Sequence, residues 1–195
     1  MQELLEGKSG GLSLLFPSSE PPQKGIMFSY AKSAKARIEP MVWPFGKRTL
    51  KAQYLPIPDG WAVMEGERNG LPVILRCHAG YRAFKGVAGY EYQVGIVVPL
   101  CAPEPSGLPS SPEVAELDQM EDAICSALEA ERESLFVAVI STGGMREFVF
   151  YTRDPEQVKL KFEQLRASIK THRIQLMIQP DKDWAVFARQ TQRRK

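Results

Sequence analysis

A Thr-Gly-Gly turn at residues 142–144 is followed at once by Arg146 and Glu147. Glycine turns expose backbone N–H groups, and a neighbouring guanidinium can clamp a phosphate or a carboxylate. The combination is therefore a candidate anion-binding site. The alternative is a hairpin turn that leads into a strand carrying one charge of each sign on its outer face. No second anion-binding signal accompanies the turn, so we favour the hairpin.

A second candidate is the cluster of Asp181, Asp183 and Trp184. Paired carboxylates can bind a divalent cation or share a proton. The chain has no Asp-x-Asp-x-Asp-Gly loop that would complete the shell of such a cation. The alternative, which we favour, is an Asx turn in which Trp184 closes the edge of the core. A pocket with converging carboxylates, such as Asp183 beside Glu147, would revive an enzyme hypothesis.

The three cysteines, Cys77, Cys101 and Cys125, are too widely spaced for a Cys-x-x-Cys motif, and their odd number is typical of reduced thiols. The chain has two histidines, His78 and His172. His78 follows Cys77 directly, and neighbours on a strand point to opposite faces. No nucleophile–base pair, nucleotide-binding loop or metal motif occurs. We therefore assign no catalytic residue, no metal ligand and no cofactor.

Aromatic and basic residues are mixed in the segment 81–92, which contains Tyr81, Arg82, Phe84, Lys85, Tyr90 and Tyr92. Stacking rings beside cations are how sheets bind single-stranded nucleic acid. Residues 24–51 add seven basic side chains against one acid. These two features make nucleic-acid binding an alternative function. The net charge of +2 argues against a strongly basic binder.

The segment 110–128 predicts an amphipathic helix. Ser110 is the expected N-cap and Glu113 the partner that completes a capping box. Apolar residues then recur at helical spacing. The opposite face is acidic and includes Glu116, Asp118 and Asp122. This face is explained most simply as a solvated helix surface. The acidic face also suits the docking of a basic partner.

The other elements follow from short local signals. Asn69-Gly70 lies between strand-like runs at 61–66 and 72–77, which predicts a tight hairpin. Asp154 and Pro155 begin a second amphipathic helix that runs to about residue 170. Further strands are predicted at 91–99, 135–141, 146–152 and 174–178. We expect residues 181–184 to close the last of these strands.

From residue 91 the order is strand, helix, strand, strand, helix, strand. This is the split β-α-β pattern of a ferredoxin-like sandwich. We expect an α+β fold whose antiparallel sheet carries two helices on one face, because each helix has a single apolar stripe. The preceding hairpin would extend the sheet or cover its open face. An unpaired sheet edge could support a homodimer.

The chain has 195 residues, of which 44% are hydrophobic and 25% charged. These values are typical of one globular domain, expected at 56–190. Residues 1–55 are predicted to be a poorly ordered basic extension and 191–195 a basic tail. Met27 and Met41 also suggest that the true start lies downstream of Met1. Without a long apolar run or a signal-peptide pattern, we expect no membrane segment and a cytoplasmic location.

Several short features form a recognisable set. They are Trp61 at a strand start, Gly70-Leu71-Pro72 after the first turn, Gly107-Leu108-Pro109 before the first helix, the turn and strand at 142–151, and Asp181-Lys182-Asp183-Trp184. Together they resemble a bacterial family called domain of unknown function 695 over residues of about 61–187. This resemblance implies a fold and no chemistry. A more distant likeness is to ferredoxin-like regulators that inhibit ribonuclease E, which implies protein binding by analogy alone.

These observations predict a small, non-catalytic module that binds or regulates another protein. The alternative is a nucleic-acid or nucleotide binder that uses the basic N-terminal segment and residues 81–92. A third hypothesis is an enzyme whose site has no recognisable motif. The candidate binding surface consists of Arg146, Glu147, Asp181, Asp183, Trp184, Glu116, Asp118 and Asp122.

Overall fold

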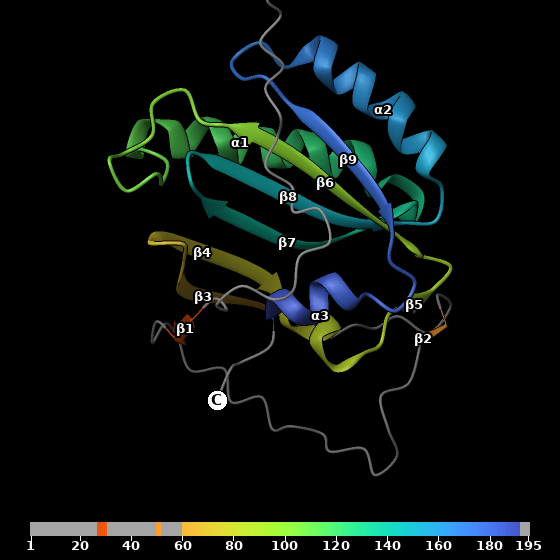
Figure 1. Cartoon of the computed structure of the whole chain (residues 1–195). Coiled ribbons are helices and arrows are strands. Elements are labelled where there is room, and N and C mark those ends of the chain that lie inside the picture. The colour runs from red at the N-terminus through yellow and green to blue at the C-terminus, as the bar shows by residue number, and fades with distance from the viewer. Residues whose placement is uncertain (1–26, 31–49, 52–59, 192–195) are drawn as a thin grey trace, which may run out of the picture.

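The computed structural model describes residues 27–30, 50–51 and 60–191. The predictions for the basic extension at 1–55, for the tail at 191–195 and for a downstream start therefore lie almost wholly outside the described residues. The structure is of the α+β class, with a large antiparallel sheet and helices on both of its faces (Figure 1).

Seven strands form the sheet, in the order β1-β3-β4-β7-β8-β6-β9. Each neighbouring pair is antiparallel. The strands are β1 (Met27–Tyr30), β3 (Trp61–Arg68), β4 (Leu71–His78), β6 (Tyr92–Pro99), β7 (Ser134–Thr142), β8 (Met145–Thr152) and β9 (Gln175–Pro180). The short strands β2 (Leu50–Lys51) and β5 (Val87–Ala88) form a separate parallel pair. Strand β9 is an edge of the large sheet, and the homodimer expected at such an edge stays a prediction.

The predicted hairpin is confirmed as β3 and β4. Asn69 and Gly70 at its tip have φ values of 54° and 78°. Two left-handed residues in a two-residue turn match the twist of the flanking strands, which explains the Asn-Gly pair. Strand β4 pairs with β7, as in the register Val73↔Thr142. The hairpin therefore extends the sheet and does not cover it.

Helices α1 (Ser111–Leu128) and α2 (Pro155–Ser168) lie on one face of the sheet, as expected. The side chains of Leu117, Ile124 and Phe162 pack there against the strands. The N-terminus of α2 is capped as predicted. The Asp154 carboxylate accepts hydrogen bonds from the amides of Glu156 and Gln157, each at 3.1 Å.

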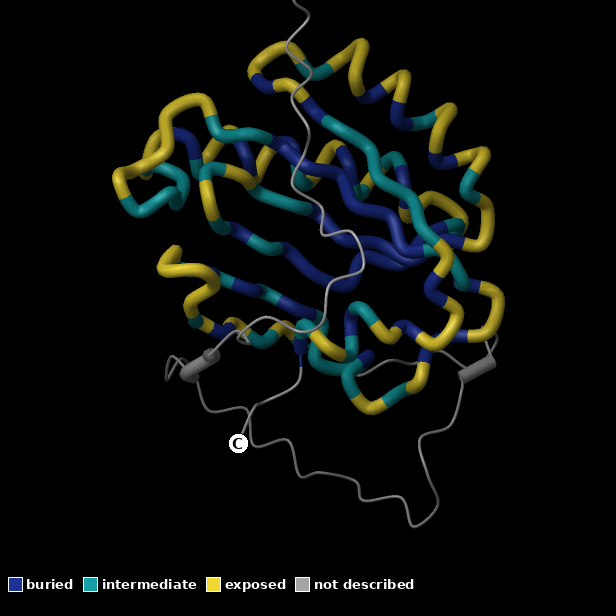
Figure 2. Tube along the Cα trace, in the orientation of Figure 1, coloured by how far each residue is buried: buried dark blue, intermediate teal, exposed yellow. Residues whose placement is uncertain are grey.

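The other face of the sheet is covered by a third helix, α3 (Ala185–Thr191), and by the short 3-10 helix η2 (Ala79–Ala83). Residues 181–184 follow the last strand, β9, as predicted, but helix α3 after them was not predicted. Phe187 of α3 and the preceding Trp184 are 2% and 1% exposed. Burying a large apolar side chain contributes roughly 1.5–3 kcal/mol. Figure 2 shows the buried strands between the two layers.

No helix within the described ranges is long and apolar enough to cross a lipid bilayer. The cytoplasmic location expected from the sequence stays a prediction.

Candidate functional site at the start of helix α1

Glu113 in the first turn of α1 does not form the predicted capping box. Ser110 makes no side-chain capping bond, and the Glu113 carboxylate points instead to the segment after β6. Its Oε1 accepts a hydrogen bond from the Cys101 amide at 2.5 Å. The Ala102 amide lies 3.3 Å from Oε2 and 3.4 Å from Oε1. Glu113 is 5% exposed, so it ties α1 to this segment from within the protein.

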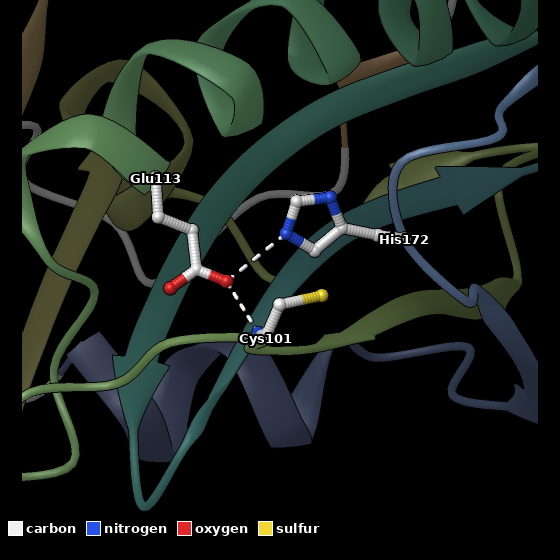
Figure 3. Close-up of side chains that lie close together, drawn as sticks. All are labelled: Cys101, Glu113 and His172. Carbon is white, nitrogen blue, oxygen red and sulfur yellow. Dashed lines mark hydrogen bonds and ion pairs between the residues drawn. The ribbon is translucent and has the colours of Figure 1, made fainter.

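His172, from the linker between α2 and β9, is the third donor to Glu113. Its Nε2 lies 3.0 Å from Glu113 Oε1, and the imidazole is buried. The other ring nitrogen, Nδ1, lies 3.1 Å from Thr171 Oγ1 and 3.8 Å from Glu116 Oε2. One carboxylate therefore joins three segments that are far apart in the sequence (Figure 3).

The electrostatics of Glu113 favour its charged form. Burial acts to raise the pKa of this carboxyl, but the hydrogen bonds from the Cys101 amide, the His172 imidazole and the Ala102 amide outweigh burial and lower the pKa below its ordinary value. A negative charge in the first turn of a helix is also favourable because the N-terminal end carries partial positive charge.

Cys101 adds a thiol to this pair. Its side chain is exposed, and its Sγ lies 3.8 Å from the Thr171 carbonyl oxygen. The ligand atoms of Cys101, Glu113 and His172 all lie within 4.8 Å of one another. Figure 3 shows the Glu113 carboxylate and the His172 ring turned toward each other, with the Cys101 side chain beside them. Sulfur, carboxylate oxygen and imidazole nitrogen together form a ligand set typical of a transition-metal ion.

An open hollow lies beside this triad, which we define as Cys101, Glu113 and His172. Its volume is about 320 Å³. Helix α1 contributes Glu116, Gln119, Met120 and Ala123 to its walls, and residues 168–171 form the opposite side. Such a volume is at the small end for ligand sites and admits one or two side chains of a partner. Glu116 and Thr171 belong to the hollow and also contact His172 at Nδ1, so the hollow adjoins the side of the imidazole that faces away from Glu113.

A model of the family described as a family of unknown function, DUF695, matches residues 59–189. The chain belongs to this family. The match confirms the resemblance inferred from the sequence, and it includes all three residues of the triad. Neither the curated proteins nor the solved structures contain a match to the chain. The comparisons give no support to the more distant likeness to ribonuclease E regulators.

The three residues of the triad of this DUF695 protein were not grouped from the sequence, although one signal was present. Strand β9 runs antiparallel to β6, with Val97 opposite Gln175. This arrangement places the last residues of β6 and the first residues of β9 at the same end of the sheet, where α1 also begins. The predicted order of strands and helices already implied that Cys101, Glu113 and His172 would approach one another.

The acidic residues predicted on α1 lie on its outer face. Glu116, Asp118 and Asp122 are all exposed. Asp118 Oδ1 lies 3.3 Å from Arg146 Nη1, so two candidate residues pair with each other. Glu121, one turn along the helix, pairs with Arg76 of β4. Part of the acidic surface is thus balanced by arginines of the sheet.

The glycine turn does not expose a complete anion site. The Gly144 amide donates to the Gly107 carbonyl at 2.8 Å, and Arg146 Nε donates to Ser141 Oγ at 3.2 Å. Glu147, the next residue along β8, points to the opposite face, over Gly95. Burial raises the pKa of the Glu147 carboxyl, and Arg68 only partly opposes this shift. The turn is a hairpin connection, as favoured from the sequence.

Asp181 and Asp183 have different environments. Asp181 is buried and accepts hydrogen bonds from Tyr151 Oη at 2.5 Å and from the amides of Ala185 and Val186 at 2.8 and 3.0 Å. Asp183 is exposed. Asp181 therefore caps α3. The two carboxylates do not share a site.

Trp184 lies in the core, and its ring stacks on Tyr151 with centroids 4.0 Å apart. Glu147 precedes Tyr151 by four residues on β8, or about 13 Å along the strand. A pairing of Asp183 with Glu147 of the kind that would revive the enzyme hypothesis finds no support in this geometry.

Two of the four aromatic residues of the segment 81–92 belong to the core. Tyr81 and Tyr90 are 6% and 2% exposed. Tyr81 packs against Trp184 with centroids 5.4 Å apart, and Tyr90 Oη donates to the Arg132 carbonyl at 2.6 Å. These rings offer no exposed platform on which bases could stack. The basic residues of 24–51 lie mostly outside the described part of the chain.

Proposed function

We propose that this DUF695 protein is a non-catalytic module that binds a basic segment of another protein along the exposed face of α1. The observation that carries the proposal is the charge of this helix. Its 18 residues include five acids and no Lys, Arg or His. Glu116 and Asp122 are exposed, and no ion pair with a Lys or Arg is found for either among the described residues.

The hollow beside α1 gives the proposed partner a place to insert an apolar side chain. Met120, Ala123 and Ile169 supply apolar contact surface, and Glu116 stands at the rim. Interfaces typically combine an apolar anchor with a charged rim that steers the encounter. A partner segment with basic residues flanking one apolar residue fits both the charge and the shape.

A finer assignment of the fold supports this proposal. We infer that the unit from β6 to β9 is a ferredoxin-like sandwich. Its strand order, β7-β8-β6-β9, and its two helices on one face are those of a split β-α-β unit. In such a unit the outer surface of the helices remains free for other proteins. The fold by itself assigns no partner.

The proposal is tested with a fluorescent peptide of alternating arginine and leucine residues, whose binding is followed by fluorescence anisotropy at low salt. The wild-type protein is compared with a Glu116→Lys/Asp122→Lys variant. Each exposed contact between opposite charges is worth about 0.2–1 kcal/mol, and reversal also adds repulsion. We expect the variant to bind at least about tenfold more weakly. Affinity should also fall as salt screens the charges.

The matched control is Glu156→Lys/Glu163→Lys, which makes the same charge change on the exposed surface of α2. We expect the control to bind nearly as well as the wild type. Equal loss of peptide binding in both variants would show that the effect depends on net charge alone, and it would refute a site on α1. A single-stranded oligonucleotide that binds the protein while the arginine peptide does not would favour the nucleic-acid alternative instead.

A further inference from the structure

We propose that Cys101, Glu113 and His172 form a binding site for a single zinc-class transition-metal ion, with one coordination position left for a ligand from outside the triad. No motif in the sequence indicates such a site, because the three residues come from three separate segments. The inference rests on the positions of the ligand atoms and on the groups that hold them. It is independent of the docking proposal.

The distance between His172 and Glu113 requires a shared proton or a metal ion between the facing atoms. Nε2 and Oε1 are 3.0 Å apart, and both atoms can present lone pairs. A proton meets this requirement, and a metal ion can replace it. Ligand nitrogen and oxygen atoms on tetrahedral zinc lie roughly 3.3 Å apart, given bond lengths near 2.0 Å. The pair therefore needs to open by only a few tenths of an ångström.

The third ligand has the freedom to close on the ion. Cys101 Sγ lies within 4.8 Å of the other two ligand atoms, whereas sulfur and nitrogen ligands of zinc are about 3.6 Å apart. Cys101 is exposed, so rotation of its side chain can supply this movement of about 1 Å. Its own amide is held by Glu113, which keeps the residue at the site.

The groups that form hydrogen bonds to the ligand side chains are those that a metal site requires. A metal-bound histidine donates its second ring N–H to an oxygen atom. Thr171 Oγ1 lies 3.1 Å from His172 Nδ1, with Glu116 Oε2 behind it at 3.8 Å. The Glu113 carboxylate is oriented by the amides of Cys101 and Ala102. Both buried ligands are therefore held in place before an ion binds.

The proton balance of binding follows from these contacts. The thiol of Cys101 loses its proton to solvent as the sulfur–metal bond forms. In the neutral imidazole the proton on Nε2 moves to Nδ1, where Thr171 Oγ1 accepts the hydrogen bond. Nothing is oxidised or reduced.

The mixture of sulfur, nitrogen and oxygen selects the class of ion. Magnesium and calcium prefer oxygen ligands, of which the triad offers one carboxylate. A borderline ion such as Zn²⁺, or Co²⁺ as its spectroscopic substitute, accepts all three atom types. Three protein ligands leave a fourth position, which a water molecule or a donor atom of a bound partner can fill.

The test is a titration of the reduced, full-length protein with Co²⁺, followed by displacement with Zn²⁺. We expect one ion per chain, a thiolate-to-cobalt charge-transfer band in the near ultraviolet, and a Kd of about 1 µM or tighter for Zn²⁺. Cys101→Ser should abolish the band and weaken Zn²⁺ binding by more than the roughly 10- to 100-fold typical of an outer-shell change. Because Cys101 is exposed, this variant should fold normally.

Cys125→Ser is the matched control, since Cys125 lies on α1 outside the triad. It should keep both the band and the stoichiometry. Zn²⁺ should raise the melting temperature of the wild type and of this control but not that of Cys101→Ser. His172→Gln, which can still donate to Glu113, should also lose tight binding. Absence of binding, or a band that survives Cys101→Ser, would overturn the proposal.

Discussion

Two helices of this protein begin at a buried carboxylate, and the two carboxylates make similar bonds. Glu113 at α1 accepts hydrogen bonds from two backbone amides and from the imidazole of His172. Asp181 at α3 accepts from two amides and from the hydroxyl of Tyr151. Each carboxylate thereby fastens a helix to the rest of the fold. The difference lies in the third donor and in the access of solvent.

The α3 end is closed. Tyr151 packs with Trp184 and Phe187 in the core, and Asp181 is buried. Burial, followed by the hydrogen bond to Asp181, raises the pKa of the Tyr151 hydroxyl far above its ordinary value. The α1 end brings an imidazole and an exposed thiol to its carboxylate. At α3 the anchored carboxylate thus contributes to stability alone. At α1 the same arrangement lies beside an imidazole and a thiol that can bind the proposed metal ion.

The largest effect is expected for Asp181→Ala. This change removes three hydrogen bonds to a charged acceptor and leaves the buried Tyr151 hydroxyl without its partner. Hydrogen bonds to charged groups contribute about 1.5–3 kcal/mol, and loss of a helix cap costs about 1 kcal/mol. Allowing for partial rehydration, we expect a loss of about 4 kcal/mol, measured by urea denaturation. Asp183→Ala, an exposed neighbour, should change stability by less than about 0.5 kcal/mol.

A smaller loss, of about 2 to 3 kcal/mol, is expected for Glu113→Ala in the same assay. The amides of Cys101 and Ala102 belong to exposed residues, so water can replace the carboxylate there more easily than at Asp181. Glu116→Ala is the control on the exposed face of α1 and should be nearly neutral. If Glu113→Ala costs more than Asp181→Ala, the distinction between an open and a closed anchor is wrong.

The pH dependence of stability should report on another buried group on the α3 side of the sheet, the Cys77 thiol. Burial raises the pKa of the Cys77 thiol from 9.0 to about 11, and Arg82 opposes this only in part. The native state therefore holds the thiol proton more tightly than the unfolded state. This contribution is complete below about pH 9 and is lost as pH rises toward 11. The thiol should account for about 2 kcal/mol of lost stability between pH 8 and pH 10.5.

Cys77→Ala provides the comparison for this measurement. The variant should be less stable than the wild type at pH 8 because its core contains a small cavity. Its free energy of unfolding should then fall less steeply than that of the wild type as pH rises. Parallel pH profiles for the two proteins would show that the buried thiol does not contribute.

The sequence predicts the elements of this fold better than the contacts between them. Asn69-Gly70 specifies a hairpin and Asp154-Pro155 a helix start, because the physical causes lie within two or three residues. The role of Glu113 was predicted wrongly because a capping box is a local pattern. The side-chain partner that Glu113 actually has, His172, lies 59 residues away. The topology alone contained the information that brought these residues together.

Helix α3 escaped prediction for a related reason. It has seven residues, too few to show a helical period, and Trp184 before it has a φ of 55° that interrupts any continuous pattern. Burial of Tyr81 and Tyr90 likewise depends on distant partners. Tyr81 packs on Trp184, and without that contact an aromatic residue near basic ones resembles a binding surface.

The pairing of β4 with β7 has a consequence for the newly made chain. The strands β3 and β4 are adjacent in the sequence, but the strand that pairs with β4 lies about 70 residues further on, as in Val73↔Thr142. At translation rates of about 5–20 residues per second, the edge of β4 waits for several seconds before β7 emerges. During this time the hydrogen-bonding edge of β4 is unpaired, and Val73, Leu75 and Cys77, all buried in the final fold, lack their packing partners on β7.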